Sequence, residues 1–389
     1  MWKEKVDSYI DEIKDKLIGV SKEIFDNPET AFKEFKASQL LADELHKAGF
    51  EVDLGVAGLK TAIRAVHPAK SEGSTIAILG EYDALPKIGH GCGHNLIATA
   101  ALGASLALGT IKTNLPGKLI FFGTPAEEEG GGKIKMIQSG LFDDIDVAMM
   151  FHPSSGYTMA GRGSLAMTEV KIEFFGKAAH SSSSPEDGIN ALDAVIQTFN
   201  GINALRQHIR ASARIHGIIT HGGLKPNIVP DYAAACFYVR SPDNEYCDEL
   251  LNKLRNIVQG AALATGATHS FDIVSSLQAM KCNRILGKTF IKNLEALGEP
   301  IQPLKTKKWG STDMGNVSQV VPSIHPYIQI CDENIPGHSK EFAKAAISKR
   351  GQETMLKAAK AFAMTAIDLY TNFELVKQIK EEFSNSSYL

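Results

Sequence analysis

Residues 89–95 form a short glycine-rich segment, Gly-His-Gly-Cys-Gly-His-Asn, with three side chains of types that often bind metal ions. These are His90, Cys92 and His94, and the glycines between them let the backbone turn sharply. A thiolate together with imidazole is a strong donor set for a metal such as zinc. Taken alone, the segment is also compatible with a surface loop that carries incidental histidines, so other parts of the chain must decide.

Further side chains that can bind metal ions, carboxylates and histidines, follow three apolar segments and one Pro-Gly turn elsewhere in the chain. The carboxyl ends of strands are where α/β proteins place ligand sites. Consecutive glutamates suit hydrolysis at a metal centre, because one carboxylate can bind the metal while its neighbour acts as general base. A solvated acidic turn and structural histidines are the alternative interpretations. The candidates are Glu81, Asp83, Glu127, Glu128, Glu129, His152 and His338.

Helical and strand patterns alternate along the part of the chain that carries most of these candidates. Apolar residues at helical spacing predict helices over 3–24, 34–48 and 97–109. Continuous apolar runs predict buried strands in the segments STIAILG, KLIFFGTP and VAMMFHP, and each run leads toward candidate residues. This alternation indicates an α/β fold with helices packed against a sheet.

The pattern changes near residue 165, and the strand that follows alternates apolar and polar residues. The segment 166–280 reads strand, helix, strand, strand, helix, strand, which is typical of a ferredoxin-like α+β domain. Long helices and loops resume after it. We therefore predict a mixed-sheet catalytic domain built from residues 1–165 and 281–389, interrupted by an inserted α+β domain over 166–280.

Composition limits the classes of protein that the chain can represent. Hydrophobic residues make up 44% and charged residues 22% of the 389 residues, which allows a sizeable buried core. The net charge of −3 predicts no general attraction to nucleic acid or to an anionic membrane. Five scattered cysteines favour a reducing compartment, and the charged N-terminal segment lacks the apolar core of a signal peptide. No uncharged apolar run reaches about 18 residues, so we expect a cytoplasmic protein.

The order and identity of the motifs resemble those of peptidase family M20, and within it the amidohydrolase branch, subfamily D. That branch includes aminoacylases, indole-acetyl-amino-acid hydrolases and aminobenzoyl-glutamate hydrolases. The resemblance covers nearly the whole chain, and GEYDALP, GHGCGHN and GSTDMGNVS look closest to members that act on small dipeptides and aminobenzoyl-glutamate. The other matching motifs are NPETAFKEFKAS, PAEEEGGG, FHP, GKAAHSSSSPEDGINALDA, NIVPD and GHSKEF.

The resemblance implies a centre with two divalent metal ions in each copy of the chain. We expect Zn²⁺, with Mn²⁺ as the alternative. Cys92 matches the ligand that bridges the two ions in this branch of the family. The complete set of residues that match metal ligands is Cys92, His94, Glu128, His152 and His338.

The resemblance also assigns roles to residues beside the ligands. Glu127 matches the general base, and Asp83 matches an aspartate with a supporting role in catalysis. His90 precedes the ligand pair, and we expect it to orient a ligand. Glu129 stands where the family usually has glycine, so it has no assigned role.

The inserted domain is implied to act as a lid and a dimerisation surface, in a homodimer or a dimer of dimers. His180 matches a histidine that reaches the partner's active site and stabilises the oxyanion of the tetrahedral intermediate. Asn227 matches a lid residue that contacts substrate. Arg240 either binds a substrate carboxylate through its bidentate fork or forms a structural ion pair, and both interpretations stay open. The residues expected to line the substrate cleft are Gly310, Ser311 and Thr312, with Asp313 supporting the loop.

The implied reaction is metal-dependent hydrolysis of an amide or peptide bond in small peptides or N-acyl amino acids. A water that bridges the two metals attacks the carbonyl, and its pKa falls from about 15.7 towards about 7. Glu127 takes the proton of this water and then delivers it to the leaving amine, so no covalent enzyme intermediate is needed.

Three other hypotheses compete with this one. A cysteine hydrolase with Cys92 as nucleophile is disfavoured, because a thiol two residues from His94 in a glycine loop suits joint ligation. A non-catalytic two-domain protein that binds metal or peptide is disfavoured by the extra glutamate beside the ligand. An endopeptidase that acts on longer peptides stays open, since the sequence does not choose between substrate lengths.

Overall fold

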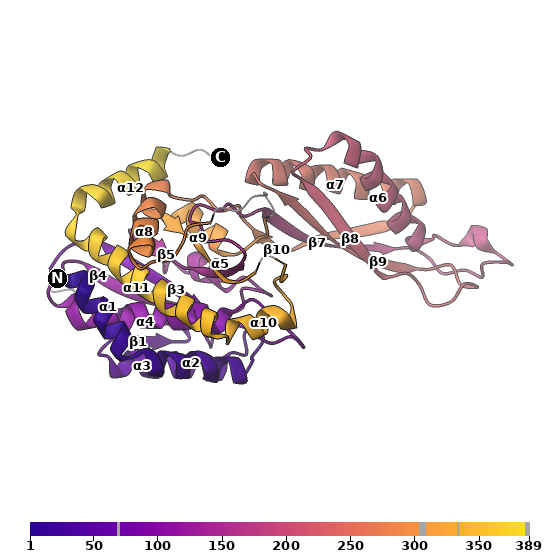
Figure 1. Cartoon of the computed structure of the whole chain (residues 1–389). Coiled ribbons are helices and arrows are strands. Elements are labelled where there is room, and N and C mark those ends of the chain that lie inside the picture. The colour runs from indigo at the N-terminus through magenta and orange to yellow at the C-terminus, as the bar shows by residue number, and fades with distance from the viewer. Residues whose placement is uncertain (68–70, 303–308, 333, 386–389) are drawn as a thin grey trace. The chain divides into compact units, whose positions relative to one another are not determined.

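The computed structural model describes residues 1–67, 71–302, 309–332 and 334–385. The chain forms two compact units (Figure 1). Unit 1 contains Met1–Gly163 and the later stretches that begin at Met280 and Thr312, whereas unit 2 contains Ser164–Ala279 and the short segment Trp309–Ser311. The sequence pattern places the insertion at 166–280 and gives no sign that residues 309–311 group with it.

Unit 1 is built on a six-stranded mixed sheet, in agreement with the predicted fold class. The first strands along the sheet pair antiparallel, and the remaining pairs are parallel. The central strands are apolar and buried on both faces, as parallel strands between helices are. The strands in spatial order are β1 Glu51–Leu54, β2 Ile63–His67, β4 Lys118–Thr124, β3 Thr75–Glu81, β5 Val147–Met149 and β11 Ser323–Ile324. A separate parallel pair consists of β6 His152–Ser155 and β12 Tyr327–Cys331.

Helices account for most of the rest of unit 1. The predicted helices at 34–48 and 97–109 are confirmed, but the one predicted over 3–24 is two helices that meet at Ile13. The backbone of Ile13 leaves helical geometry, at φ −94° and ψ 10°, while its N–H still donates to the carbonyl of Tyr9. The helices are α1 Trp2–Glu12, α2 Lys14–Asp26, α3 Phe35–Lys47, α4 His94–Lys112, α5 Gly132–Gln138, α8 Arg284–Ala296, α9 Met314–Val320, α10 Lys340–Ala346, α11 Lys349–Thr371 and α12 Phe373–Asn385.

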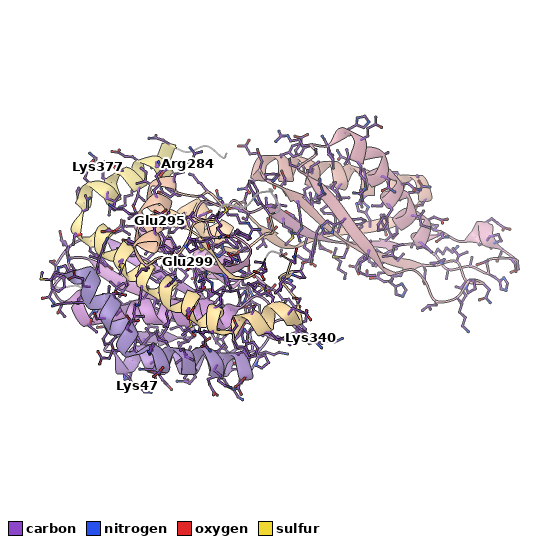
Figure 2. All side chains as sticks on the ribbon, viewed as in Figure 1. Lys47, Arg284, Glu295, Glu299, Lys340 and Lys377 are labelled. Carbon is purple, nitrogen blue, oxygen red and sulfur yellow. The ribbon has the colours of Figure 1, made fainter. Side chains whose placement is uncertain are left out.

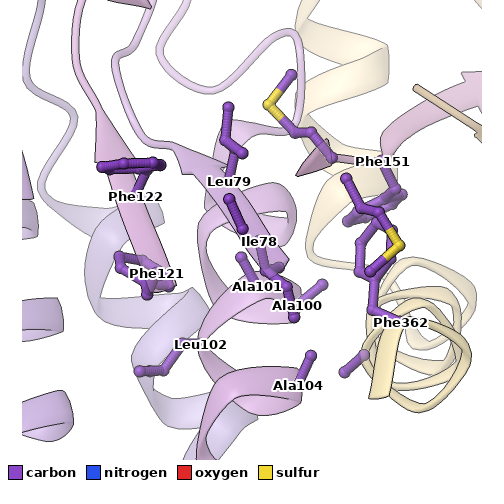
Figure 3. Close-up of a cluster of buried hydrophobic side chains, with 14 of the residues drawn as sticks. Ile78, Leu79, Ala100, Ala101, Leu102, Ala104, Phe121, Phe122, Phe151 and Phe362 are labelled. Carbon is purple, nitrogen blue, oxygen red and sulfur yellow. The ribbon is translucent and has the colours of Figure 1, made fainter. Parts of the chain in front are cut away.

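The central helix α4 sits against β3 and β4 on one side and against α1, α2 and α11 on the other. Its small side chains, such as Ala100, Ala101 and Ala104, let the neighbouring elements approach closely, as Figure 3 shows. By length and composition α4 could cross a membrane, but 89% of the apolar stretch is buried inside the protein, which is typical of a core helix. Because α4 begins at His94, its packing also fixes the end of the glycine-rich segment.

Unit 2 has the predicted strand-helix-strand-strand-helix-strand order. Its four strands form an antiparallel sheet in the order β10-β7-β9-β8, and both helices cover one face of it (Figure 1). Alternate residues of β7, including Val170, Ile172 and Phe174, are buried beneath these helices, as the alternating pattern predicts. The elements are β7 Ala166–Phe175, α6 Ala191–Leu205, β8 Arg214–His221, β9 Tyr232–Ser241, α7 Asn244–Thr265 and β10 Thr268–Leu277.

Candidate metal and active site

The fold brings the predicted metal ligands together from four separate segments of unit 1. Donor atoms of Cys92, His94 and His152 lie within 4.8 Å of one another. The same holds for donor atoms of Cys92, Glu128 and His338. Cys92 therefore belongs to two groups of three donors, which is the arrangement that a ligand shared by two ions requires.

Glycine is needed where the glycine-rich segment turns into α4. Gly93 has a φ of 76°, which other residues rarely adopt, and a Cβ atom there would lie 2.7 Å from Cγ of Pro153. The absence of a side chain thus allows the segment after His152 to approach Cys92 and His94. His338 is itself held in a left-handed conformation, with φ 59°, and its N–H donates to the carbonyl of Gly91 at 3.0 Å.

Asp83 orients two of the candidate ligands. Nδ1 of His94 lies 2.8 Å from the carbonyl oxygen of Asp83 and 3.1 Å from its Oδ1, so Nδ1 carries the proton and donates it. The other carboxylate oxygen of Asp83 accepts the backbone N–H of Glu128 at 3.0 Å. Nε2 of His94 is therefore the nitrogen left for a metal ion, a tautomer that carboxylate partners commonly fix.

Several donor atoms at the centre of the site are buried and lack a hydrogen-bond partner among the described residues. They include Nε2 of His94, Oε1 of Glu81 and Oε1 of Glu128. Nε2 of His94 lies 3.3 Å from Oε1 of Glu81, and Nε2 of His338 lies 3.6 Å from Oε1 of Glu128. A buried polar atom without a partner costs about 1–3 kcal/mol, and a divalent cation at this point would satisfy several of them at once. The residues present therefore fit a metal centre.

The charges around the site favour a bound cation at His94. Burial lowers the pKa of His94, but the carboxylates of Glu81 and Asp83 outweigh burial and hold the pKa well above its usual value. Burial lowers the pKa of His152 to about 4, which keeps this imidazole neutral and able to bind a metal. Its Nδ1 donates to the carbonyl of Pro153 at 2.6 Å, so its Nε2 is also available.

The surroundings of Cys92 argue against the cysteine-hydrolase hypothesis. Burial raises the pKa of the Cys92 thiol, and the neighbouring charge of Glu128 raises it further. Nucleophilic cysteines have the opposite property, a lowered pKa in an electropositive environment. Without a cation beside it the thiol stays protonated, so its chemistry is that of a metal ligand.

Glu127 lies in the same cluster as the ligand candidates. Its donor atom is within 4.8 Å of those of His94 and Glu128, and within 4.8 Å of those of Glu81 and Asp313. Burial raises the pKa of Glu127 well above its usual value, and the charges of Glu81, Glu128 and Asp313 raise it further. A carboxylate with a raised pKa accepts a proton readily near neutral pH, as a general base must.

Two residues of these motifs lie away from the donor atoms. Nε2 of His90 donates to the carbonyl of Ile24 at 3.0 Å, so this buried histidine ties the glycine-rich segment to α2. The sequence predicts that His90 orients a ligand, whereas its hydrogen bond positions the loop backbone. Glu129 is exposed and belongs to none of the donor groups formed by the described residues.

Two candidates of unit 2, His180 and Asn227, lie on neighbouring loops. His180 is exposed, and its Nδ1 accepts the N–H groups of Ser182 and Ser183, each at 3.3 Å, so its Nε2 carries the proton. The carbonyl of Asn227 accepts the N–H of Ser181 at 3.1 Å, which places the Asn227 loop beside the His180 loop.

Arg240 forms a hydrogen bond with a serine and no ion pair with a carboxylate of the described residues. Its guanidinium donates to the hydroxyl of Ser311 at 3.1 Å, and no carboxylate of the described residues lies within ion-pair distance. Its Nε is buried without a hydrogen-bond partner among the described residues. The carbonyl of Gly310 accepts the N–H of Leu165 at 2.7 Å, and the hydroxyl of Thr312 accepts the N–H of Met314 at 3.2 Å, at the start of α9.

Sequence reasoning missed Lys133, which lies fully buried beside the site and bonds to Glu81 and Asp313. A lone lysine after a glycine run does not predict a buried site residue, because lysine is almost never fully buried unless it is paired. The carboxylates that pair with Lys133 lie far from it in the sequence. The sequence places Glu81 at a strand end but assigns it no role.

Comparison with known proteins agrees with these observations. Residues 77–361 match the model of the family described as peptidase family M20/M25/M40. The chain is 39% identical to an Xaa-Arg dipeptidase of Mus musculus, over 96% of this chain and 90% of that protein. It is 33% identical to one of the chains of the p-aminobenzoyl-glutamate hydrolase of Escherichia coli, over 81% of this chain and 68% of that protein.

A solved structure shows the same fold. The crystal structure of an aminohydrolase-like protein from methicillin-resistant Staphylococcus aureus superposes with a TM-score of 0.82 and 20% identity, over 95% of this chain and 100% of that one. The predicted family, the fold class and the enzyme class, a hydrolase acting on peptide or amide bonds, are confirmed. The chain belongs to peptidase family M20/M25/M40.

Proposed function

We propose that this protein hydrolyses the amide bond of dipeptides and N-acyl amino acids at a centre that holds two divalent ions, Zn²⁺ or, as the alternative, Mn²⁺. The observation that carries the proposal is the position of Cys92, which belongs to two groups of three donors at once. Dipeptides with C-terminal arginine are the first substrates to test, because the more similar of the two relatives is an Xaa-Arg dipeptidase. Acyl derivatives of glutamate come second, because the other relative is a p-aminobenzoyl-glutamate hydrolase.

The residues of unit 1 divide into ligands and a base. One ion would be held by Cys92, His94 and His152, and the other by Cys92, Glu128 and His338. When bound, such ions lower the pKa of a coordinated water towards about 7 and polarise the substrate carbonyl. Asp83 keeps the Nε2 of His94 available by accepting its Nδ1–H.

Glu127 is the proposed general base. Its raised pKa lets it take the proton of the attacking water and then return this proton to the leaving amine. Glu128 cannot easily share this task, because in the proposed arrangement its carboxylate is occupied as a ligand. Adjacent glutamates with different roles explain why the motif contains more than one carboxylate.

The residues of unit 2 supply recognition and oxyanion stabilisation. Because Nδ1 of His180 accepts hydrogen bonds, its Nε2–H is the group free to donate to an oxyanion. The guanidinium of Arg240, which has no carboxylate partner among the described residues, is suited to bind the substrate carboxylate. We propose that unit 2 is the lid and dimerisation domain of a homodimer or a dimer of dimers, and that His180 acts in the partner's site.

A substrate panel with the metal-loaded enzyme tests the function. Dipeptides and N-acyl amino acids should be cleaved, whereas blocking the substrate carboxylate as an amide should weaken binding. Cleavage inside long peptides with blocked ends would establish the endopeptidase alternative instead. A metal-loaded protein that cleaves no member of the panel would support the non-catalytic binding protein.

A further inference from the structure

A buried lysine joins two carboxylates beside the candidate metal donors. Nζ of Lys133 donates to Oε2 of Glu81 at 2.6 Å and to Oδ1 of Asp313 at 2.7 Å, and all three side chains are fully buried. The backbone N–H of Lys133 also donates to Oδ2 of Asp313 at 3.1 Å. Asp313 therefore holds both the backbone and the ammonium of Lys133, which in turn fixes one oxygen of Glu81.

The other oxygen of Glu81 is directed at His94. Oε1 of Glu81 has no hydrogen-bond partner among the described residues and lies 3.3 Å from Nε2 of His94, which also has none. Nδ1 of His94 is engaged by Asp83, so Nε2 is the atom available to a metal. The free oxygen of Glu81 and the free nitrogen of His94 thus converge on the same point.

The cluster around Lys133 contains more carboxyl groups than ammonium groups. One ammonium, that of Lys133, faces the carboxylates of Glu81 and Asp313, and the carboxylate of Glu127 lies within 4.8 Å of both. Uncompensated buried charge is costly, and one oxygen of Glu81 remains without a donor among the described residues. A proton on Nε2 of His94, which lies 3.3 Å from Oε1 of Glu81, would supply one positive charge here, whereas a divalent ion contacted by Oε1 of Glu81 would supply two.

We propose that Glu81 is a further ligand of the metal centre, on the side of His94, and that Lys133 and Asp313 are positioning residues that hold it there. The inference rests on the proposed metal-dependent function. A carboxylate oxygen added to sulfur and nitrogen donors raises the coordination number and makes the site more suitable for Mn²⁺.

The test measures metal binding, independently of turnover. Glu81→Gln keeps the shape of the side chain and can still accept from Lys133, but it presents an amide to His94. We expect its affinity for Co²⁺, measured by competition with a chelator, to fall about 10-fold or more. The visible absorption of the Co²⁺-loaded protein should also change, because the coordination number falls. Lys133→Met should change this spectrum in the same direction.

Glu299→Gln is the matched control. Glu299, labelled in Figure 2, is a buried carboxylate of unit 1 that pairs with Arg350 and Lys357 and belongs to no donor group among the described residues. Its substitution removes one charge from a buried ion-paired cluster, as Glu81→Gln does. The Co²⁺ affinity and spectrum of this variant should match those of the natural protein.

The outcomes separate this inference from the proposed function. A folded Glu81→Gln protein that binds Co²⁺ with natural affinity and spectrum overturns the inference, whatever its turnover. A natural protein that binds no divalent ion overturns the proposed function and the inference together. Glu81→Asp provides a second variant in case glutamine impairs folding: it keeps the charge but withdraws the oxygen by one methylene, and we expect the same loss of affinity.

Discussion

Replacing Glu127 with glutamine tests the assignment of the general base and separates it from the adjacent ligand Glu128. Glutamine has nearly the same shape but cannot accept and return the proton, and all of the proposed metal donors remain in place. Loss of a positioned general base lowers turnover by about 10²–10⁴-fold, which corresponds to roughly 3–5 kcal/mol of activation free energy.

The surroundings of Glu127 also predict how the stability of this variant depends on pH. Burial and the charges of Glu81, Glu128 and Asp313 raise the pKa of Glu127 well above its usual value. In the metal-free protein the stabilising contribution of this carboxyl is complete below the pKa of the unfolded chain and is lost as the pH rises through the folded pKa. Glutamine has no such dependence, so the unfolding free energy of Glu127→Gln should increase relative to that of the natural protein between about pH 5 and pH 8.

The assay combines kcat and KM on an Xaa-Arg dipeptide, metal content per chain, and urea unfolding of the metal-free protein at several pH values. Glu128→Gln is the matched control, and it should lose metal because its carboxylate is a proposed ligand. The assignment of Glu127 as the base is wrong if Glu127→Gln loses metal while its metal-loaded fraction turns over at the natural rate. In that case Glu127 is the ligand and the base lies elsewhere.

Three further predictions concern Cys92, Arg240 and His180. Alkylation of Cys92 should be slow in the metal-loaded protein and fast after chelation, and metal binding should release protons; equal alkylation rates in both states would remove Cys92 from the site. Arg240→Met should raise KM about 10-fold or more with little change in kcat, and an equal effect on a substrate whose carboxylate is blocked would contradict the assignment. Mixing inactive His180→Ala with inactive Glu127→Gln protein should restore activity, approaching half the natural value per mixed dimer. If demonstrably mixed dimers stay inactive, His180 does not act in the partner's site.

Much of the fold was predictable because its strongest signals are local. The buried strands β3 and β4 are continuous apolar runs, and β7 of unit 2 alternates clearly. β1 and β2 were not predicted, since they are short and β1 is mostly exposed, so neither forms a long apolar run. The break at Ile13 has no glycine or proline to announce it.

The candidate site was predictable to the extent that its residues lie in compact motifs. Cys92 and His94 share one loop, and the motif order relates them to the distant His338. The ion pair between Lys133 and Asp313 was not predictable, because these residues are 180 positions apart and only the folded chain shows that they meet. The same is true of His90, whose contact with Ile24 depends on the packing of α2.

Metal titration of the depleted enzyme measures whether hydrolysis depends on two bound ions. The protein would be stripped with a chelator, dialysed, and titrated with Zn²⁺ or Mn²⁺ while bound metal and hydrolysis of an Xaa-Arg dipeptide are measured on the same samples. We expect the stripped protein to be inactive and its activity to rise to the full value as two ions bind per chain. Full activity in the stripped protein, or activity that saturates with one ion per chain while the second position stays empty, would contradict catalysis by a two-metal centre.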